Sequence, residues 1–214
     1  MRKKLKLSTH AINNNTWIVQ KYFPYNENPR AIIFLDRDDT LIKDFGDDTH
    51  KKMPRFNLDL VTCLKRISQE LDHSIILVIV TNQSRIDSNK TSMLALRRFH
   101  LAVVLYGRLL GIKINKIVTC PHSHLSKCKC RKPSPVMILD TIKSLNCSTI
   151  PKFMIGNSLS DIQSGLAAKC FTIRISHKET TPDPKQNNKL FLGYFTLKSN
   201  FAPIVLKIIE DKIF

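Results

Sequence analysis

Short segments rich in apolar residues alternate along the chain with longer segments whose apolar residues recur at helical spacing. The consecutive apolar residues at 31–35 and 75–80 suit strands that are buried on both faces of a sheet, and further short strands are predicted at 114–118, 152–155 and 171–175. The segments with helical spacing lie between them, at 57–72, 91–110, 135–146 and 159–169. This alternation predicts an α/β fold with a doubly wound parallel sheet and right-handed crossovers.

Residues near the ends of the predicted helices support these bounds. Asn57 is placed to cap the first helix, and Gly111 follows the second helix at the position where a left-handed residue often ends one. The polar segment 43–55 predicts a small flap over the carboxyl end of the sheet. We expect this flap, rather than a large cap domain, to cover the site, which favours a small substrate over a folded protein.

The two ends of the chain fit the alternating pattern less well. We therefore predict an N-terminal extension at 1–30, a central α/β domain at 31–176 and a C-terminal extension at 177–214. One strand is expected near 17–19, and the apolar stretch 201–214 predicts a helix that docks on the domain. Neither extension has a motif that indicates a function.

Composition indicates an ordinary soluble protein with a strongly basic surface. The hydrophobic fraction is 43% and the charged fraction 24%, while 34 Lys and Arg against 17 Asp and Glu give a net charge of +17. The basic residues are scattered, so a solvated surface is favoured over a nucleic-acid interface. The longest aliphatic run, 75–80, is too short to span a membrane, and the basic start lacks the apolar stretch of a secretory signal. We expect a cytoplasmic monomer.

Two carboxylates directly follow the first predicted strand. Asp36 and Asp38 are spaced i, i+2, and ligands of an α/β sheet bind at the carboxyl ends of its strands. Two anions held so close require a cation, and Mg²⁺ prefers oxygen ligands. A carboxylate neutralised by such a cation can attack phosphorus while a second carboxyl group moves the proton. The pair therefore predicts a magnesium-dependent phosphoryl-transfer site.

Polar side chains follow three further predicted strands. The second strand leads into Thr81, Asn82, Gln83 and Ser84, whose hydroxyl and amide groups can surround a phosphate. The third leads to Cys120 and then to Arg131-Lys132, and the fourth ends at Gly156-Asn157 with Asp161 shortly after. Because the carboxyl ends of parallel strands meet at one edge of a sheet, these groups are expected to share one site.

Four further side chains have the spacing of a metal site. Cys120, His122, Cys128 and Cys130 lie within eleven residues and suit tetrahedral Zn²⁺. With four protein ligands no coordination position is open, so this zinc is expected to be structural and to fix the loop that leads to Lys132. His124 is a competing ligand. The remaining cysteines, Cys63, Cys147 and Cys170, fall in predicted helices or strands and are expected to be core residues.

Residues 31–176 resemble the haloacid dehalogenase superfamily of phosphatases, whose four motifs appear in order. The resemblance implies that Asp36 is the nucleophile that becomes an aspartyl-phosphate and that Asp38 is the general acid and base. It implies that Thr81 hydrogen-bonds the transferring phosphoryl group and that Lys132 supplies positive charge to it. The implied magnesium site comprises Asp36, Asp38, Asn157 and Asp161, although the superfamily usually has Asp at the position of Asn157.

The zinc cluster followed by Arg131-Lys132-Pro133 resembles one branch, which contains the D-glycero-D-manno-heptose 1,7-bisphosphate and histidinol-phosphate phosphatases. This resemblance implies substrate contacts from Arg131 and from Asn82, Gln83 and Ser84, and the run at 81–86 is more similar to the heptose enzymes. Arg85 departs from the pattern, because relatives of the heptose type usually have Gly at this position. Asp39 also stands where many relatives have Gly.

The sequence therefore predicts a Mg²⁺-dependent phosphatase that acts on a small phosphorylated sugar, with heptose 1,7-bisphosphate as the first choice. Histidinol phosphate is the nearest alternative substrate. A polynucleotide 3′-phosphatase would fit the net charge, but the zinc cluster counts against it. A binding protein that has lost turnover through Asn157 is the alternative of another class.

Overall fold

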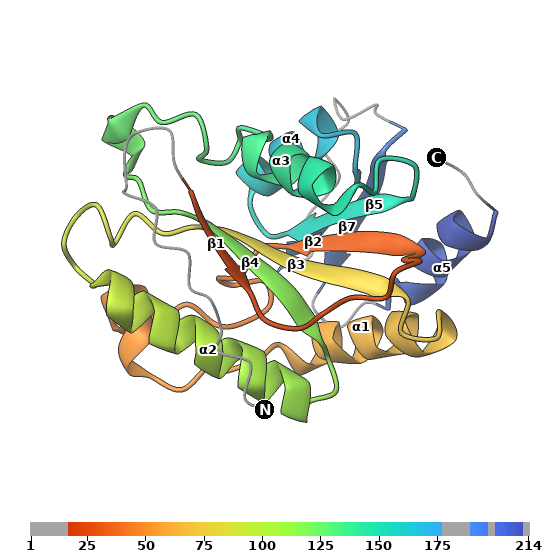
Figure 1. Ribbon diagram of the computed structural model, residues 1–214, viewed down its shortest axis with the longest axis horizontal. Helices are drawn as coiled ribbons and strands as arrows, with labels where there is room; N and C mark the ends of the chain where they lie inside the picture. The colour runs from red at the N-terminus through yellow and green to blue at the C-terminus, as the bar shows by residue number, and fades with distance from the viewer. Residues whose placement is uncertain (1–16, 177–188, 197–199, 212–214) are drawn as a thin grey trace.

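One sheet of seven strands lies between two layers of helices in the computed structural model, which describes residues 17–176, 189–196 and 200–211 (Figure 1). The strands are β1 (Ile18–Lys21), β2 (Ala31–Leu35), β3 (Ile75–Asn82), β4 (Ile114–Cys120), β5 (Lys152–Gly156), β6 (Phe171–Ser176) and β7 (Phe191–Thr196). The helices are α1 (Leu58–Glu70), α2 (Met93–Leu109), α3 (Val136–Leu145), α4 (Leu159–Ala167) and α5 (Ala202–Glu210), with short 3₁₀ helices η1 (Gly46–Lys51) and η2 (His124–Ser126). The predicted α/β architecture is confirmed.

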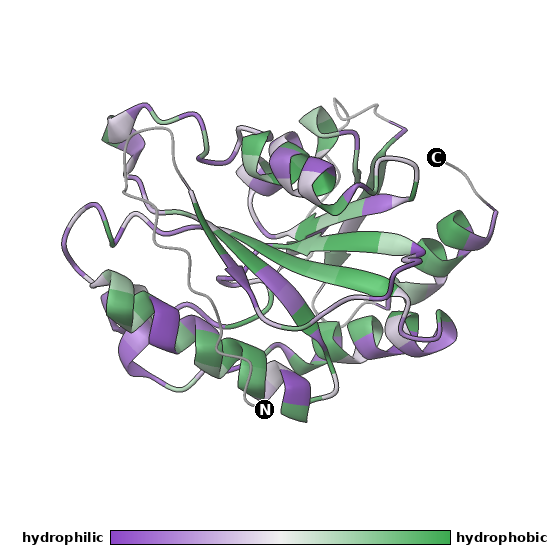
Figure 2. Cartoon of the chain, viewed as in Figure 1, coloured by the Kyte–Doolittle hydropathy of each residue, from purple (hydrophilic) through white to green (hydrophobic). Residues whose placement is uncertain are grey.

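The sheet is buried on both faces, and its central strand β2 is apolar at every position. In β2 the side chains of Ala31, Ile33 and Leu35 join a core beneath α1, α2 and α5, whereas Ile32 and Phe34 join a second core beneath α3. All five residues are fully buried. In Figure 2 the central strands β2 and β3 are largely apolar along their length, whereas apolar and hydrophilic residues alternate along the helices.

The order of strands places the functional segments together. It is β1-β4-β3-β2-β5-β6-β7, and all neighbours are parallel except β1 and β4. The chain proceeds from β2 through β3 to β4 on one side, and then returns to β5 on the other side of β2. This reversal between β2 and β5 opens a crevice at the carboxyl ends of the strands, where ligands of open α/β sheets bind.

Both ends of the described chain extend the central sheet. The strand expected near 17–19 is β1, which pairs antiparallel with β4 at one edge. β7 was not predicted, because its residues are half-buried at the opposite edge and Gly193 (φ +129°) interrupts the pattern. The predicted docking helix is α5, which packs on the α1 side of the sheet, and residues 212–214 of that prediction lie outside the described residues. The proposed domain boundaries at 30 and 176 stay predictions.

No helix within the described ranges is both long and apolar enough to cross a membrane.

The two predicted helix ends are confirmed: the Asn57 side chain accepts the backbone N–H of Leu60, and Gly111 takes a positive φ of 90° after α2.

Candidate active site

The carboxyl ends of four adjacent strands, β4, β3, β2 and β5, open into a polar cavity of about 660 Å³. Its lining includes the following candidates from the sequence: Asp36, Asp38, Thr81, Asn82, Ser84, Lys132, Asn157 and Asp161. The structure thus brings together groups that lie up to 125 residues apart in the chain, as the parallel topology predicts (161 − 36 = 125).

Lys132 lies between two carboxylates at the base of this cavity. Its Nζ is 2.6 Å from Asp36 Oδ1 and 2.6 Å from Asp161 Oδ1, and it donates a hydrogen bond of 2.7 Å to the backbone carbonyl of Val80. Although burial disfavours the charged form, Asp161 and Asp36 raise the pKa of Lys132 above its ordinary value. The ammonium group is therefore a fixed positive charge where phosphoryl oxygens would be placed.

Asp36 follows the last residue of β2 and is almost fully buried. Burial, together with the negative charges of Asp161 and Asp38, raises its pKa to about 7 against the lowering effect of Lys132. One neighbouring ammonium is therefore not enough to stabilise the carboxylate of Asp36. A cation in the cavity would favour the ionised, nucleophilic form.

Asp38 is held on the opposite side of the strand end by Arg37 and Gln83. Arg37 Nε donates to Asp38 Oδ1 at 2.8 Å and Arg37 Nη2 to Asp38 Oδ2 at 2.9 Å, while Gln83 Nε2 donates to Oδ2 at 2.7 Å. Burial opposes ionisation, but the guanidinium group and these hydrogen bonds lower the pKa of Asp38 below its ordinary value. Its carboxylate is thus an acceptor with a fixed orientation.

The last residues of β3 and the two residues after them line the cavity or support other residues of the site. Thr81 and Ser84 line the cavity. The Asn82 side chain holds the backbone of Lys132, accepting its N–H at 3.1 Å and donating to its carbonyl at 3.2 Å. Gln83, which the resemblance places at the substrate, is 1% exposed and donates to Asp38 and to Thr81 Oγ1. Its substrate contact stays a prediction, whereas its support of these two residues is observed.

The turn between β5 and α4 fixes Asp161 by a capping box. The Ser158 hydroxyl accepts the backbone N–H of Asp161, and Asp161 Oδ2 accepts the Ser158 N–H at 2.9 Å. Gly156 allows the close approach, since a Cβ there would overlap the side chain of Asp161. Asn157 lies between them and lines the cavity.

We expect Gly156→Ala to lower the free energy of unfolding by about 2 kcal/mol, because the added methyl group displaces Asp161 and its cap. Thermal or urea unfolding measures this change. Gly107→Ala in α2 is the matched control: its Cβ would meet side-chain atoms of Ile114 at 3.1 Å and of Ile112 at 3.3 Å but no backbone or site residue, and the change should stay within about 1 kcal/mol. Equal effects of the two substitutions would contradict the expectation.

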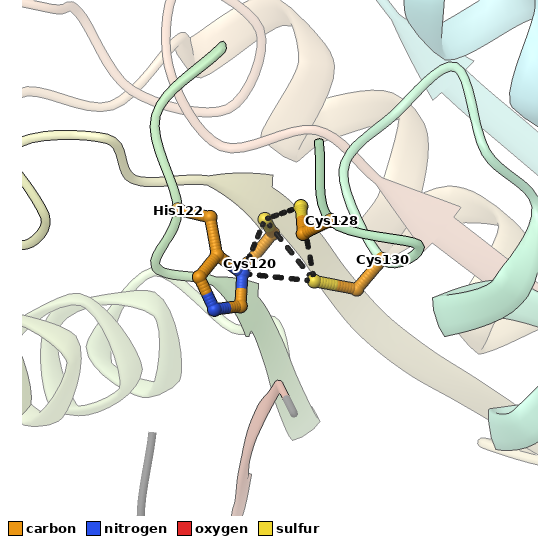
Figure 3. Close-up of side chains that lie close together, drawn as sticks. All are labelled: Cys120, His122, Cys128 and Cys130. Carbon is orange, nitrogen blue, oxygen red and sulfur yellow. Dashed lines mark hydrogen bonds between the residues drawn. The ribbon is translucent and has the colours of Figure 1, made fainter. Parts of the chain in front are cut away.

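The predicted metal cluster is assembled as a compact group (Figure 3). The ligand atoms of Cys120, His122, Cys128 and Cys130 all lie within 4.8 Å of one another, and they form the only such group of three or more His, Cys, Asp or Glu side chains in the described part of the chain. His122 presents Nδ1 to the thiols. The competing ligand His124 instead pairs with Arg131 Nη2 at 2.8 Å.

Arg131 lies beside the main cavity. Its Nη1 donates to the carbonyl of His122 at 3.0 Å, and its side chain lines an adjoining cavity of about 320 Å³. The two cavities share Asn82, His124 and Lys132 among their lining residues. The contact of Arg131 with substrate stays a prediction, and the position of Arg131 beside the main cavity supports it.

Ion pairs hold the flap against the segment after β3. Arg85 Nη2 lies 3.0 Å from Asp44 Oδ2 and Arg85 Nε 3.5 Å from Asp47, and Lys90 Nζ lies 2.9 Å from Asp47. All four side chains line the cavity. The predicted flap therefore contains η1 and lines one side of the cavity through these charged side chains.

Arg37 is a residue of the site that carried no interpretable signal in the sequence. Its side chain pairs with Asp38 and is fully buried, although an Arg in that sequence context usually faces solvent. Asp39 has a φ of 52°, which explains why Gly is common at its position and why Asp, which tolerates this region, can replace it. The Ser158–Asp161 pair did carry a signal, because Ser-x-x-Asp is the spacing of a capping box.

Comparison with known proteins identifies the family. A family model described as polynucleotide kinase 3 phosphatase matches residues 31–164, which is more than half of the chain. The chain belongs to this phosphatase family. The four strand ends that build the site all lie within the matched part of the phosphatase.

The phosphatase is similar to named heptose bisphosphate phosphatases. It is 31% identical to the D-glycero-alpha-D-manno-heptose-1,7-bisphosphate 7-phosphatase of Photorhabdus laumondii, over 79% of this chain and 96% of the relative. It is also 31% identical to the D-glycero-beta-D-manno-heptose-1,7-bisphosphate 7-phosphatase of Neisseria meningitidis, over 62% and 70%. The predicted relationship to haloacid dehalogenase phosphatases of the heptose bisphosphate type is confirmed, and this phosphatase is a phosphoric monoester hydrolase.

A solved structure shows the same fold. The D,D-heptose 1,7-bisphosphate phosphatase from B. bronchiseptica, complexed with magnesium and phosphate, matches with a TM-score of 0.66 at 23% identity, over 83% of this chain and 98% of that one. The phosphatase therefore has the α/β architecture of a haloacid dehalogenase enzyme.

Proposed function

We propose that this phosphatase removes the 7-phosphate of a D-glycero-D-manno-heptose 1,7-bisphosphate and leaves the heptose 1-phosphate. The buried group of Asp36, Lys132 and Asp161 at the base of the cavity carries the proposal, because phosphoryl transfer depends on placement and on fixed positive charge. The names of the relatives supply the substrate class, and they include both anomers of this sugar.

In the proposed mechanism Asp36 is the nucleophile. A carboxylate oxygen of Asp36 forms a bond to phosphorus while the bond from phosphorus to the sugar oxygen breaks, and Asp38 gives that oxygen a proton. Lys132 neutralises charge on the phosphoryl oxygens, and the hydroxyl of Thr81 donates a hydrogen bond to one of them. Water then attacks the aspartyl-phosphate, its proton passes to Asp38, and Asp36 leaves as a carboxylate.

The cavity fits a magnesium ion by its donor set. Asp36, Asp38, Asn157 and Asp161 present oxygen atoms from the segment after β2, the turn after β5 and the first turn of α4. Burial, and after it the negative charges of Asp161 and Asp38, raise the pKa of Asp36, so a further positive charge would stabilise its carboxylate. We propose that these four residues hold Mg²⁺. When bound, the ion would neutralise charge on the phosphate and favour the ionised form of Asp36.

The cysteine and histidine cluster fits a zinc ion by its dimensions. A tetrahedral site with Zn–S bonds of about 2.3 Å has S···S edges of about 3.8 Å. The three Sγ–Sγ distances are 3.3, 3.6 and 3.7 Å, and His122 Nδ1 lies 3.2 and 3.6 Å from the sulfurs of Cys130 and Cys120. We propose a structural Zn²⁺ with Cys120, His122, Cys128 and Cys130 as its ligands.

We expect Asn157→Asp to lower the Mg²⁺ concentration at half-maximal activity by about tenfold, because a carboxylate adds a negative charge to an oxygen-rich site. Titration of activity with Mg²⁺ measures the shift, and Asn157→Ala is the matched control that should move it in the opposite direction. If the natural chain is inactive and only Asn157→Asp turns over, the protein is the non-catalytic binding protein of the alternative hypothesis.

Phosphate release from a panel of substrates tests the proposed function. The panel contains both anomers of heptose 1,7-bisphosphate, histidinol phosphate, fructose 1,6-bisphosphate, p-nitrophenyl phosphate and a 3′-phosphorylated oligonucleotide, each with Mg²⁺ and with a chelator. We expect the highest kcat/KM for one heptose anomer. A preference for histidinol phosphate or for the oligonucleotide would assign the substrate to the corresponding alternative. The cytoplasmic location and the monomeric state stay predictions.

A further inference from the structure

The segment before the matched family region contributes two side chains, Gln20 and Tyr22, to a largely buried chain of hydrogen bonds that ends at Asp38. The chain of contacts runs from Tyr22 through Gln20, His100 and Arg37 to Asp38, and it joins β1, α2 and the end of β2. Gln20 is 5% exposed, and His100 and Arg37 are fully buried.

The direction of every hydrogen bond in this chain follows from chemistry. Arg37 can only donate, so His100 Nε2 accepts from Arg37 Nη1 at 2.9 Å and the proton of the ring lies on Nδ1. His100 Nδ1 therefore donates to Gln20 Oε1 at 2.6 Å, and Gln20 Nε2 donates to the hydroxyl oxygen of Tyr22 at 2.7 Å. Burial and the adjacent Arg37 lower the pKa of His100 well below 6.5, which keeps the ring neutral.

Arg37 has its position fixed from three sides. His100 accepts from Nη1, Asp38 accepts from Nε and Nη2, and the ring of Phe99 lies 5.2 Å from the guanidinium carbon. Because Gln83 donates to the same carboxylate, Asp38 receives three hydrogen bonds from groups that can only donate to it. Such a carboxylate is oriented as a proton acceptor.

We propose that Gln20 and His100 are positioning residues, which hold Arg37 so that Asp38 accepts a proton from water in the second half of the reaction. This inference rests on the proposed function. In that step the water oxygen forms a bond to phosphorus, the bond between phosphorus and Asp36 breaks, and the electron pair remains on the Asp36 carboxylate. The proton of the water goes to Asp38.

The test compares His100→Phe and Gln20→Leu with the natural enzyme, at saturating concentration of the substrate it turns over fastest in the panel. We measure kcat and the fraction of enzyme trapped as aspartyl-phosphate by acid quench. We expect kcat to fall about tenfold in His100→Phe and about threefold in Gln20→Leu, with a rise in the trapped fraction, because the loss of a proton acceptor slows the second half. His100→Gln, whose carbonyl can accept from Arg37, should recover part of kcat.

Asn115→Leu is the matched control. Asn115 is 3% exposed, and its side chain also joins β4 to the N-terminal segment, through hydrogen bonds to the carbonyls of Phe23 and Pro24, without any link to Asp38. It should lower stability without raising the trapped fraction.

The outcomes separate the inference from the proposed function. A fall in kcat without a rise of the trapped fraction, or an unchanged kcat in Gln20→Leu, would overturn the positioning role while leaving the phosphatase proposal intact. Failure of the natural enzyme to release phosphate from any member of the panel would overturn the proposed function, and with it the inference. If His100→Phe does not fold, Gln20→Leu alone decides.

Discussion

Replacing Asp36 with Asn should reduce phosphate release by at least about 1,000-fold, because the amide cannot form the aspartyl-phosphate. The substitution keeps the size of the side chain and removes a buried carboxylate whose pKa is raised to about 7. In the metal-free protein, the raised pKa of this carboxyl group stabilises the folded state at a pH below the pKa that the group has in the unfolded chain. This stabilisation is lost as the pH rises through 7. The variant should therefore remain folded at pH 8, and steady-state kinetics with a thermal melt would show both results.

Asp39→Asn is the matched control for this loss. Asp39 lies three residues further along the same loop, and its Oδ1 accepts the backbone N–H of Asp44 at 3.0 Å, a bond that Asn can also make. Asn also tolerates the positive φ at this position. Activity should stay within about fivefold of the natural enzyme. An active Asp36→Asn enzyme, or equal losses in the two variants, would remove Asp36 from the role of nucleophile.

Loss of the metal cluster should have the second large effect. Cys130→Ala removes a buried ligand two residues before Lys132, so we expect the free energy of unfolding to fall by at least about 3 kcal/mol and Tm by about 6–12 °C. Activity should fall at least about tenfold at a temperature where the variant is folded, since the loop no longer fixes Lys132. Differential scanning calorimetry, metal analysis and phosphate release measure these three quantities.

Cys147→Ala provides the control for this substitution, because Cys147 is also buried but lies outside the cluster. It should retain the metal and lose only about 1 kcal/mol. A natural protein that contains no zinc after expression in zinc-supplemented medium, or a Cys130→Ala protein as stable as Cys147→Ala, would contradict a structural metal.

The parts of the fold that follow from local pattern were predictable. The strands β2 and β3 begin with apolar runs, α1 begins after a capping Asn57, and the side chains of the cysteine and histidine cluster lie within eleven residues, so that short-range spacing alone predicts the cluster. Parallel strand ends meet at one edge, which allowed Asp36, Lys132 and Asp161 to be placed in one site before their distances were known.

The other features of the fold and of the site depend on contacts between residues far apart in the sequence, which local residue spacing does not encode. β7 is an edge strand with half-buried residues, so it lacks the apolar run of a central strand. Arg37 is buried because His100, Asp38 and Phe99 surround it, and two of these partners come from α2, more than sixty residues later. The choice between His122 and His124 as ligand required the position of Arg131, which pairs with His124.

The flap has a consequence for the kinetics of substrate entry. Arg85 and Lys90 hold Asp44 and Asp47 through partly exposed ion pairs, and such pairs weaken as salt screens them. A phosphorylated ligand that enters the cavity meets the same guanidinium group and competes with the flap for it. We therefore expect these ion pairs to weaken as the ionic strength or the charge of the entering anion rises, so that a bisphosphate disrupts them more than a monophosphate does.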